Sequence, residues 1–260
     1  MDLGIKGRKA IVCASSRGLG KACALSLAKE GVSVVINGLD ADRLAATAAE
    51  LGKATSARVT PVRADINTAE GRATLVAACP DADILVNNNA GPEPGKFQDW
   101  DHASWMLAVE ANMLAPIFMI QALLPGMRAR KFGRIVNITS AMVTSPRFAH
   151  MAQSTAARAG LTGLSKSLSR DIAVDNVTIN NMLPERIDTD RQKFMAERRV
   201  KAEGLTYEDA RRKIADSVPA KRFGRTEEFG DTCAYLCSVQ AGFMTGQNIH
   251  LDGGSYEGIV

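Results

Sequence analysis

The sequence lacks several features that mark particular classes of protein. It has five cysteines, an odd number with no C-x-x-C pair, so neither a disulfide framework nor a metal knuckle is expected. The formal net charge of +4 is too small to indicate a nucleic-acid partner. No uninterrupted apolar run approaches the ~20 residues of a membrane helix, and the opening residues 1–6 lack the layout of a signal peptide. These absences predict a cytoplasmic protein with free, buried thiols and with no metal, nucleic-acid or membrane partner.

Short apolar segments alternate with longer amphipathic stretches along the chain. The short segments are rich in β-branched residues and predict strands at Lys9–Ala14, Val32–Ile36, Arg58–Arg63, Ile84–Asn87, Gly133–Ile138, Val177–Leu183 and Asn248–Leu251. The longer stretches predict helices at Gly20–Glu30, Ala41–Leu51, Ala69–Ala78, Ser104–Arg130, Ser154–Asp175 and Glu227–Ser238. This alternation predicts one α/β domain over residues 1–260, a Rossmann-type doubly wound parallel sheet of about seven strands with helices on both faces.

Residues 188–225 interrupt this alternation. They are rich in Arg and Lys and contain no convincing strand. A long insert in a compact domain often forms a lid over a binding site, so we predict a substrate lid here. A solvated helical surface explains the charges equally well.

A turn rich in serine and glycine follows the first predicted strand. Residues 13–20 read Cys-Ala-Ser-Ser-Arg-Gly-Leu-Gly and lead into a predicted helix. The first N–H groups of a helix have no backbone partner and attract phosphate, and ligands of such sheets bind beyond the carboxyl ends of the strands. The predicted pyrophosphate contacts are Ser15, Ser16, Arg17, Gly18, Leu19 and Gly20. Glycine is common at such turns, so the motif by itself is weak.

Later segments resemble, in order, the landmarks of the short-chain dehydrogenase/reductase family. The turn resembles its T-G-x-x-x-G-x-G motif, and Asp83–Gly91 resembles its D-I-L-V-N-N-A-G element. Gly133–Ser140 resembles the strand that ends in its catalytic serine, and Pro219–Glu228 and Thr245–Gly254 match its C-terminal landmarks. The likeness covers nearly the whole chain. It implies a nicotinamide cofactor with further contacts at Asp65, Ile66, Asn88, Ala90, Arg158, Pro184, Ile187 and Thr189.

The Tyr-x-x-x-Lys pair of that family is missing. Alignment on Ala-Gly-Leu at residues 159–161 places Ser154 at the tyrosine position and Arg158 at the lysine position. No tyrosine precedes Tyr207, so a small shift of the alignment does not restore the pair. A subgroup usually labelled as oxoacyl reductases shares this pattern together with a Gly/Pro-rich segment, here Pro92–Gly95.

The resemblance implies that Asn112, Ser140, Ser154 and Arg158 are the catalytic residues. Ketone reduction needs a hydride, a proton and stabilisation of the developing alkoxide. A serine hydroxyl is a much weaker acid than tyrosine, whose pKa is about 10, and arginine is a permanent cation. We therefore expect Ser154 to orient the substrate oxygen or to relay a proton through water.

Each candidate also has a plainer structural interpretation. Ser140 could simply end a strand, Ser154 could cap its helix, Arg158 could pair with an acid, and Asn112 could support a kink near Pro116. Further residues weighed for catalysis are His150, Glu185 and Tyr207, whereas His102 and His250 are interpreted as structural.

The segment after the second predicted strand bears on the choice of cofactor. NAD-preferring members of the family usually carry an Asp there, but Gly38 occupies this position. Arg17 could pair with a 2′-phosphate, although Leu39 stands where an arginine is usual. We predict NADP(H), with NAD(H) as the alternative.

Three functions remain open at this point. The first is an NAD(P)-dependent oxidoreductase that interconverts a small ketone or oxoacyl group and a secondary alcohol without the usual tyrosine. The second is an inactive nucleotide-binding relative with a regulatory or scaffold role, and the third is a dehydratase or isomerase. The basic insert suggests an acidic or carrier-bound substrate. The family commonly pairs the helices predicted at Ser104–Arg130 and Ser154–Asp175 between subunits, so we expect a homotetramer or homodimer.

Overall fold

Seven parallel strands form one sheet in the computed structural model, which describes residues 1–259. In chain order the strands are β1 (Lys9–Val12), β2 (Ser33–Gly38), β3 (Val59–Arg63), β4 (Ile84–Asn87), β5 (Gly133–Ile138), β6 (Val177–Pro184) and β7 (Asn248–Leu251). Their spatial order is β3-β2-β1-β4-β5-β6-β7, so the chain reverses its direction of travel between β1 and β4. The crevice outside the carboxyl ends of these two strands is where such folds bind ligands.

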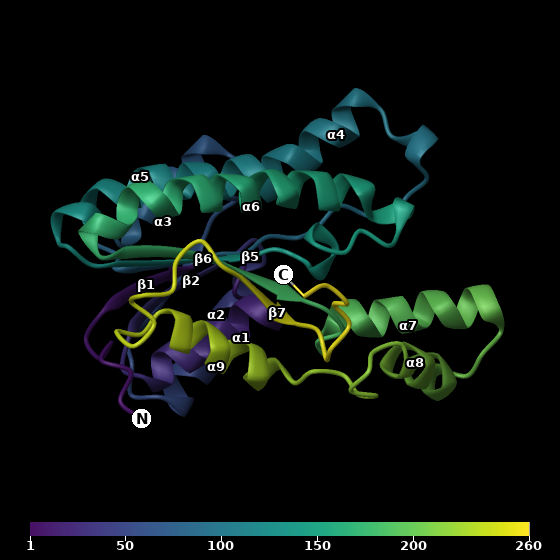
Figure 1. The fold of residues 1–260 in the computed structure, drawn as a ribbon. Coiled ribbons are helices and arrows are strands. Elements are labelled where there is room, and N and C mark those ends of the chain that lie inside the picture. Colours follow the sequence, from purple (N-terminus) through teal and green to yellow (C-terminus); the bar gives the residue numbers. More distant parts are fainter. Residues whose placement is uncertain (260) are drawn as a thin grey trace.

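Helices cover both faces of the sheet (Figure 1). One layer contains α1 (Gly18–Lys29), α2 (Ala41–Ala54) and α9 (Thr226–Leu236), and the other contains α3 (Ala69–Ala78), α4 (His102–Val109), α5 (Ala115–Ala129) and α6 (Ala152–Ile172). Each layer of helices packs against one face of the sheet and buries a separate hydrophobic core. The core under α1, α2 and α9 includes Leu27 and Phe229, and the core on the other face includes Leu75 and Met119. The predicted doubly wound α/β fold is confirmed, and all five cysteines are free and buried.

The helix predicted at Ser104–Arg130 differs from a regular helix. It consists of α4, a π-helical turn at Glu110–Leu114 and α5. Pro116 has no N–H to donate to the carbonyl of Asn112 and its ring would clash with that carbonyl, so the turn before it widens.

By length and composition the whole stretch His102–Ala129 is apolar enough to cross a membrane, with a mean hydropathy of 1.7. A single helix of this kind is weak evidence for a span, because core helices pass the same test.

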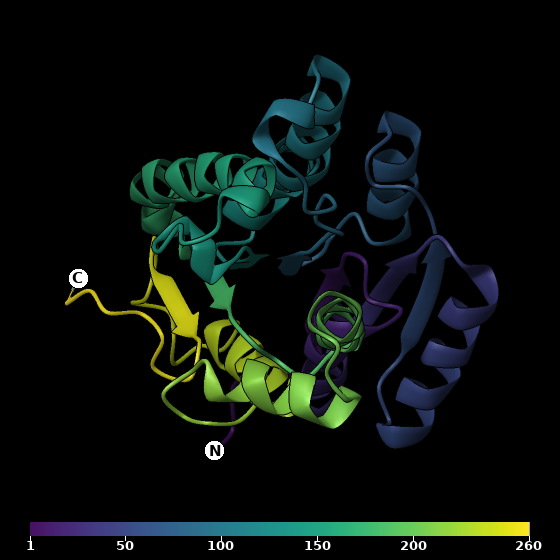
Figure 2. The ribbon, with the colours of Figure 1, turned by 90° about the vertical axis from the view of Figure 1, so that its right-hand side faces the viewer.

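The insert at residues 188–225 is helical rather than irregular. It contains α7 (Asp190–Glu203) and α8 (Tyr207–Asp216), which lie beyond the carboxyl ends of the strands (Figures 1 and 2). The two helices share a small core of Ala196, Ala210 and Ile214, with Tyr207 packed against it. Tyr207 is therefore held by the insert itself, and the role of the insert as a lid stays a prediction.

Candidate active site

The turn after β1 leaves the start of α1 open for an anion. Gly18 adopts a left-handed φ of +58°, and Arg17 precedes it without any side-chain cap on the helix. The first turn of α1 contains no acidic residue. Its N–H groups and the positive end of the helix dipole therefore suit a phosphate, which is the fit that a dinucleotide requires.

Asn88 supports this turn from the end of β4. Its Nδ2 donates to the Ala14 carbonyl oxygen at 3.1 Å. A Cβ on Gly20 would lie 2.5 Å from that same oxygen and 2.9 Å from Asn88 Nδ2, so only glycine fits there. Ala14 takes a left-handed φ of +44° at the place where the family motif has glycine. Ser15 is buried, its hydroxyl donates to the Val12 carbonyl and its N–H donates to the Asn37 carbonyl at 2.8 Å, so Ser15 shapes the turn and has no donor left for a phosphate.

The other predicted cofactor contacts lie along the same edge of the sheet. Pro184 ends β6, Ile187 forms a parallel bridge with Gly224, and Thr189 precedes α7 with its side chain near Gly18. Ala90 lies in the exposed loop after β4. The remaining contacts follow β1 and β3, namely Ser16, Leu19, Asp65 and the buried Ile66.

Arg158 is hydrogen-bonded to the two segments that carry Ser154 and Ser140. Its Nε donates to Ser154 Oγ at 3.2 Å, one helical turn earlier on α6. Its Nη1 donates to the carbonyl oxygens of Ile138 at 2.9 Å and Thr139 at 3.3 Å, the two residues before Ser140. The residue is 9% exposed, and no acid pairs with it among residues 1–259. Burial, and secondarily the charge of Arg191, lowers the pKa of Arg158 to about 10, which still leaves it protonated at neutral pH.

Ser154 is not the cap of its helix, since α6 begins at Ala152. Ser140 does cap a short 3-10 turn at Ala141–Val143, with its Oγ accepting from the Met142 N–H at 3.2 Å. Both hydroxyl oxygens therefore accept a hydrogen bond from the protein and keep their own proton free to donate.

Asn112 lies in the π-helical turn, and its Nδ2 donates to the Ala90 carbonyl at 3.3 Å and the Ala108 carbonyl at 3.4 Å. Its Oδ1 is buried and accepts no hydrogen bond from residues 1–259. A cavity of about 10 Å³, the size of one water molecule, adjoins this residue and is lined also by Arg158, Asn89 and Ile138. Asn112 and Arg158 thus both border this small cavity.

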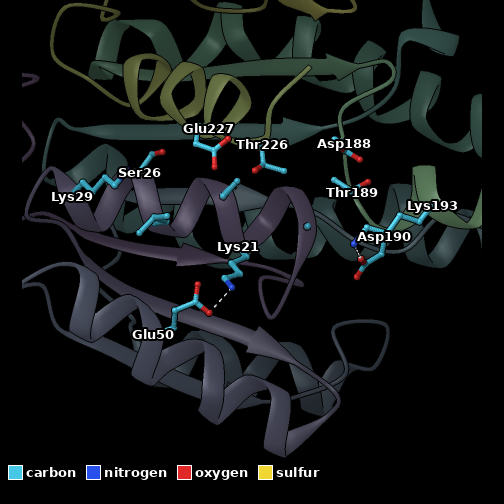
Figure 3. A pocket seen from close by; sticks show the side chains of 13 residues that line it. Lys21, Ser26, Lys29, Glu50, Asp188, Thr189, Asp190, Lys193, Thr226 and Glu227 are labelled. Atoms are coloured by element: carbon cyan, nitrogen blue, oxygen red, sulfur yellow. Dashed lines mark hydrogen bonds and ion pairs between the residues drawn. The ribbon is translucent and has the colours of Figure 1, made fainter. Parts of the chain in front are cut away.

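A larger cavity of about 280 Å³ lies elsewhere, along the outer side of α1 (Figure 3). It reaches from Gly18 and Thr189 past Lys21 and Glu50, which form an ion pair at 2.6 Å. No candidate catalytic residue lines it. We therefore assign the chemistry to the buried site around Arg158 rather than to this larger cavity.

Two features of the site were not identified from the sequence. The side chain of Glu185 is 7% exposed and forms an ion pair with Arg147, which ties the segment after β5 to the end of β6. Gly91 packs close over the site, since a Cβ on it would lie 3.5 Å from Arg158 Nη2 and 3.6 Å from Ser154 Oγ. The Asn-Asn-Asn-Ala-Gly run could have indicated that Gly91 lies in the site. No local sequence pattern indicates that Arg147 pairs with Glu185.

The histidines do not converge on Arg158. His150 is exposed and packs at a tilt against the ring of Phe148, with 5.5 Å between the ring centroids. His250 lies on β7, with its Nε2 3.3 Å from Thr144 Oγ1 and its ring stacked on Tyr256.

Known proteins resemble the chain over its full length. The family model described as enoyl-(acyl carrier protein) reductase matches residues 13–256. The NADPH-dependent reductase BacG of Bacillus subtilis is 32% identical, over 97% of this chain and 99% of that protein. The 3-oxoacyl-[acyl-carrier-protein] reductase FabG of Aquifex aeolicus is 29% identical, over 98% of this chain and 100% of its own length.

Solved structures agree with these sequence matches. The L-sorbose reductase of Gluconobacter frateurii, complexed with NADPH and L-sorbose, superposes with a TM-score of 0.94 at 30% identity and full coverage of both chains. A short-chain dehydrogenase/reductase family protein superposes with a TM-score of 0.83 at 31% identity, over 98% of this chain and 99% of its own. With the phosphate turn, the strand order and these matches in agreement, the chain belongs to the short-chain dehydrogenase/reductase family of oxidoreductases.

Proposed function

We propose that the protein is an NADP(H)-dependent oxidoreductase that interconverts a small ketone or oxoacyl group and a secondary alcohol. The observation that carries this proposal is the set of bonds from Arg158 to Ser154 and to the residues just before Ser140. NADPH-dependent relatives and structures with bound NADPH support the choice of cofactor. When bound, NADPH supplies the hydride.

The two serines and Arg158 supply what the missing tyrosine would otherwise provide. Because Arg158 Nε donates to Ser154 Oγ, the Ser154 proton is free to point at a carbonyl oxygen. Ser140 offers a second hydroxyl at the end of β5. A buried cation beside these hydroxyls stabilises the negative charge that develops on the oxygen during hydride transfer. The two serines therefore orient the carbonyl, and Arg158 makes the alkoxide easier to form.

The small cavity can hold a water molecule beside Asn112. That water would accept from Arg158 and donate to Asn112 Oδ1, a buried acceptor with no hydrogen-bond partner within residues 1–259. Arg158 holds its own proton at neutral pH, so the proton that neutralises the alkoxide comes from Ser154 and is replaced through water.

Two exposed ion pairs support a lid role for the start of α7. Arg191 lies 3.6 Å from Glu93 in the loop after β4, and Asp190 lies 3.8 Å from Arg17 in the phosphate turn. Exposed pairs of this kind contribute only about 0–1 kcal/mol each, so α7 can leave the loops that it bridges without a large cost.

The decisive test is a screen of carbonyl compounds for NADPH oxidation, comparing wild type with Ser140→Ala and Ser154→Ala. We expect each substitution to lower kcat/KM by roughly 100-fold through loss of a donor to the developing oxyanion. Ser56→Ala, an exposed serine between α2 and β3, is the matched control and should behave as wild type.

Other outcomes identify the alternatives. Tight NADPH binding without turnover of any carbonyl would indicate an inactive nucleotide-binding relative. Product formation without net change in NADPH would indicate a dehydratase or isomerase. Full activity in both serine variants would contradict the assigned roles.

A further inference from the structure

An arginine from β3 reaches the end of β2. The two strands pair so that Arg63 lies beside Gly38, and Arg63 Nε donates to the Leu39 carbonyl oxygen at 3.0 Å. Among residues 1–259 no carboxylate lies within ion-pair distance of Arg63. Its two terminal nitrogens therefore remain available beside Leu39, the position at which an arginine is missing from the sequence.

Asn37 holds the surrounding loops in place. This residue is 2% exposed, and its Oδ1 accepts from the Ala14 N–H at 3.1 Å. Its Nδ2 donates to the Ala64 carbonyl oxygen at 2.8 Å. One buried side chain thus fixes both the phosphate turn that carries Arg17 and the end of β3 that carries Arg63.

The space beside the end of β2 is narrow for an acidic side chain. A Cβ on Gly38 would lie 2.9 Å from Ser16 Oγ and 3.1 Å from Ser16 Cβ, so an Asp at this position would require the Ser16 side chain to shift. The nearby Asp40 is already engaged, because its carboxylate accepts from the Arg43 N–H at 3.0 Å and pairs with the Arg43 guanidinium at 3.1 Å. The charge left unpaired beside the end of β2 is that of Arg63, whereas Arg17 on the adjoining turn forms the exposed ion pair with Asp190.

We propose that Arg63 binds the 2′-phosphate of NADP(H), with Ser16 and Arg17 on the opposite side. A guanidinium presents paired N–H donors that match phosphate oxygens. Arg63 thereby takes the place of the arginine that would follow β2, and the selection of NADP(H) over NAD(H) comes from β3.

Binding measurements test this site without any substrate. The proposal rests on the NADP(H) dependence of the proposed function, but calorimetry with NADPH and NADH needs no turnover, so failure of the carbonyl screen leaves the test intact. We expect Arg63→Met to raise the Kd of NADPH by roughly 10- to 100-fold and to leave the Kd of NADH within about threefold. Arg63→Lys should recover part of the loss by restoring the charge without the paired donors.

Arg58→Met is the matched control, because Arg58 is exposed and lies just before the first residue of β3, at the end of the strand away from Arg63. It should leave both Kd values unchanged. Adenosine 2′,5′-bisphosphate should compete with NADPH better than 5′-AMP on wild type, and this advantage should disappear in Arg63→Met. Equal effects of Arg63→Met on NADPH and NADH, no effect on either, or wild type that binds NADPH no tighter than NADH would each overturn the proposal.

Discussion

Replacing Arg158 by Met should separate catalysis from stability. Burial of the guanidinium is costly, since the fall of its pKa from 12.5 to about 10 corresponds to roughly 3 kcal/mol. Met removes that cost, but it leaves the Ile138 and Thr139 carbonyls and Ser154 Oγ without their donor. Each lost bond costs about 1–3 kcal/mol. The three lost bonds together cost about 3–9 kcal/mol and the relief of burial offsets roughly 3 kcal/mol of this, so we expect the free energy of unfolding to fall by about 0–6 kcal/mol.

Catalysis should fall strongly whatever the size of the stability change. Removing a fixed charge or donor from a site that stabilises an oxyanion typically lowers kcat by about 10²- to 10³-fold. We expect that loss for Arg158→Met with any carbonyl found in the screen. Arg158→Lys should recover only part of it, because an ammonium cannot reach Ser154 and both β5 carbonyls together.

The assays are urea unfolding followed by circular dichroism and steady-state oxidation of NADPH. If Arg158→Met kept kcat/KM within about threefold of wild type, the guanidinium would have no part in stabilising the oxyanion. A loss of more than about 6 kcal/mol of stability would show that the residue is mainly structural.

Three further predictions concern the turn, the ion pair and the assembly. Ala14→Gly should raise the free energy of unfolding by roughly 0.5 kcal/mol, since relief of a left-handed φ slightly exceeds the entropy cost of glycine; a loss above about 1 kcal/mol in urea unfolding would contradict this. Glu185→Gln should lower stability by about 1–3 kcal/mol, because Arg147 loses the acid it pairs with; an unchanged urea midpoint would show that the pair contributes nothing. Sedimentation should show a homotetramer or homodimer, for which the exposed small residues Ala156 and Ala159 on α6 offer a close-packing face; a monomer would exclude this assembly.

Local pattern was sufficient for most elements of the fold. The strands β4, β5 and β7 and the helix α3 begin and end at the predicted residues, because apolar periodicity and turn residues act over a few positions. The π-helical turn around Asn112 was not predicted. Pro116 was noted as the cause of a kink, but whether a helix bends or widens at a proline depends on what packs against it.

The candidate site was predicted less completely than the fold. The spacing of Ser154 and Arg158 places them one turn apart on a helix, and the structure shows that they are hydrogen-bonded. The cap interpretation of Ser154 is wrong, because α6 starts two residues earlier. An acid partner for Arg158, the other structural interpretation, is also absent among residues 1–259.

The sequence by itself determined the alternation of strands and helices, the phosphate turn and the loss of the tyrosine, since all three are properties of neighbouring residues. Only the tertiary structure decided that Arg158 meets the end of β5, that Glu185 is buried against Arg147, and that Arg63 stands beside Leu39. These contacts join segments 20 to 38 residues apart in the chain. They depend on the order and register of the strands, which a local pattern does not encode.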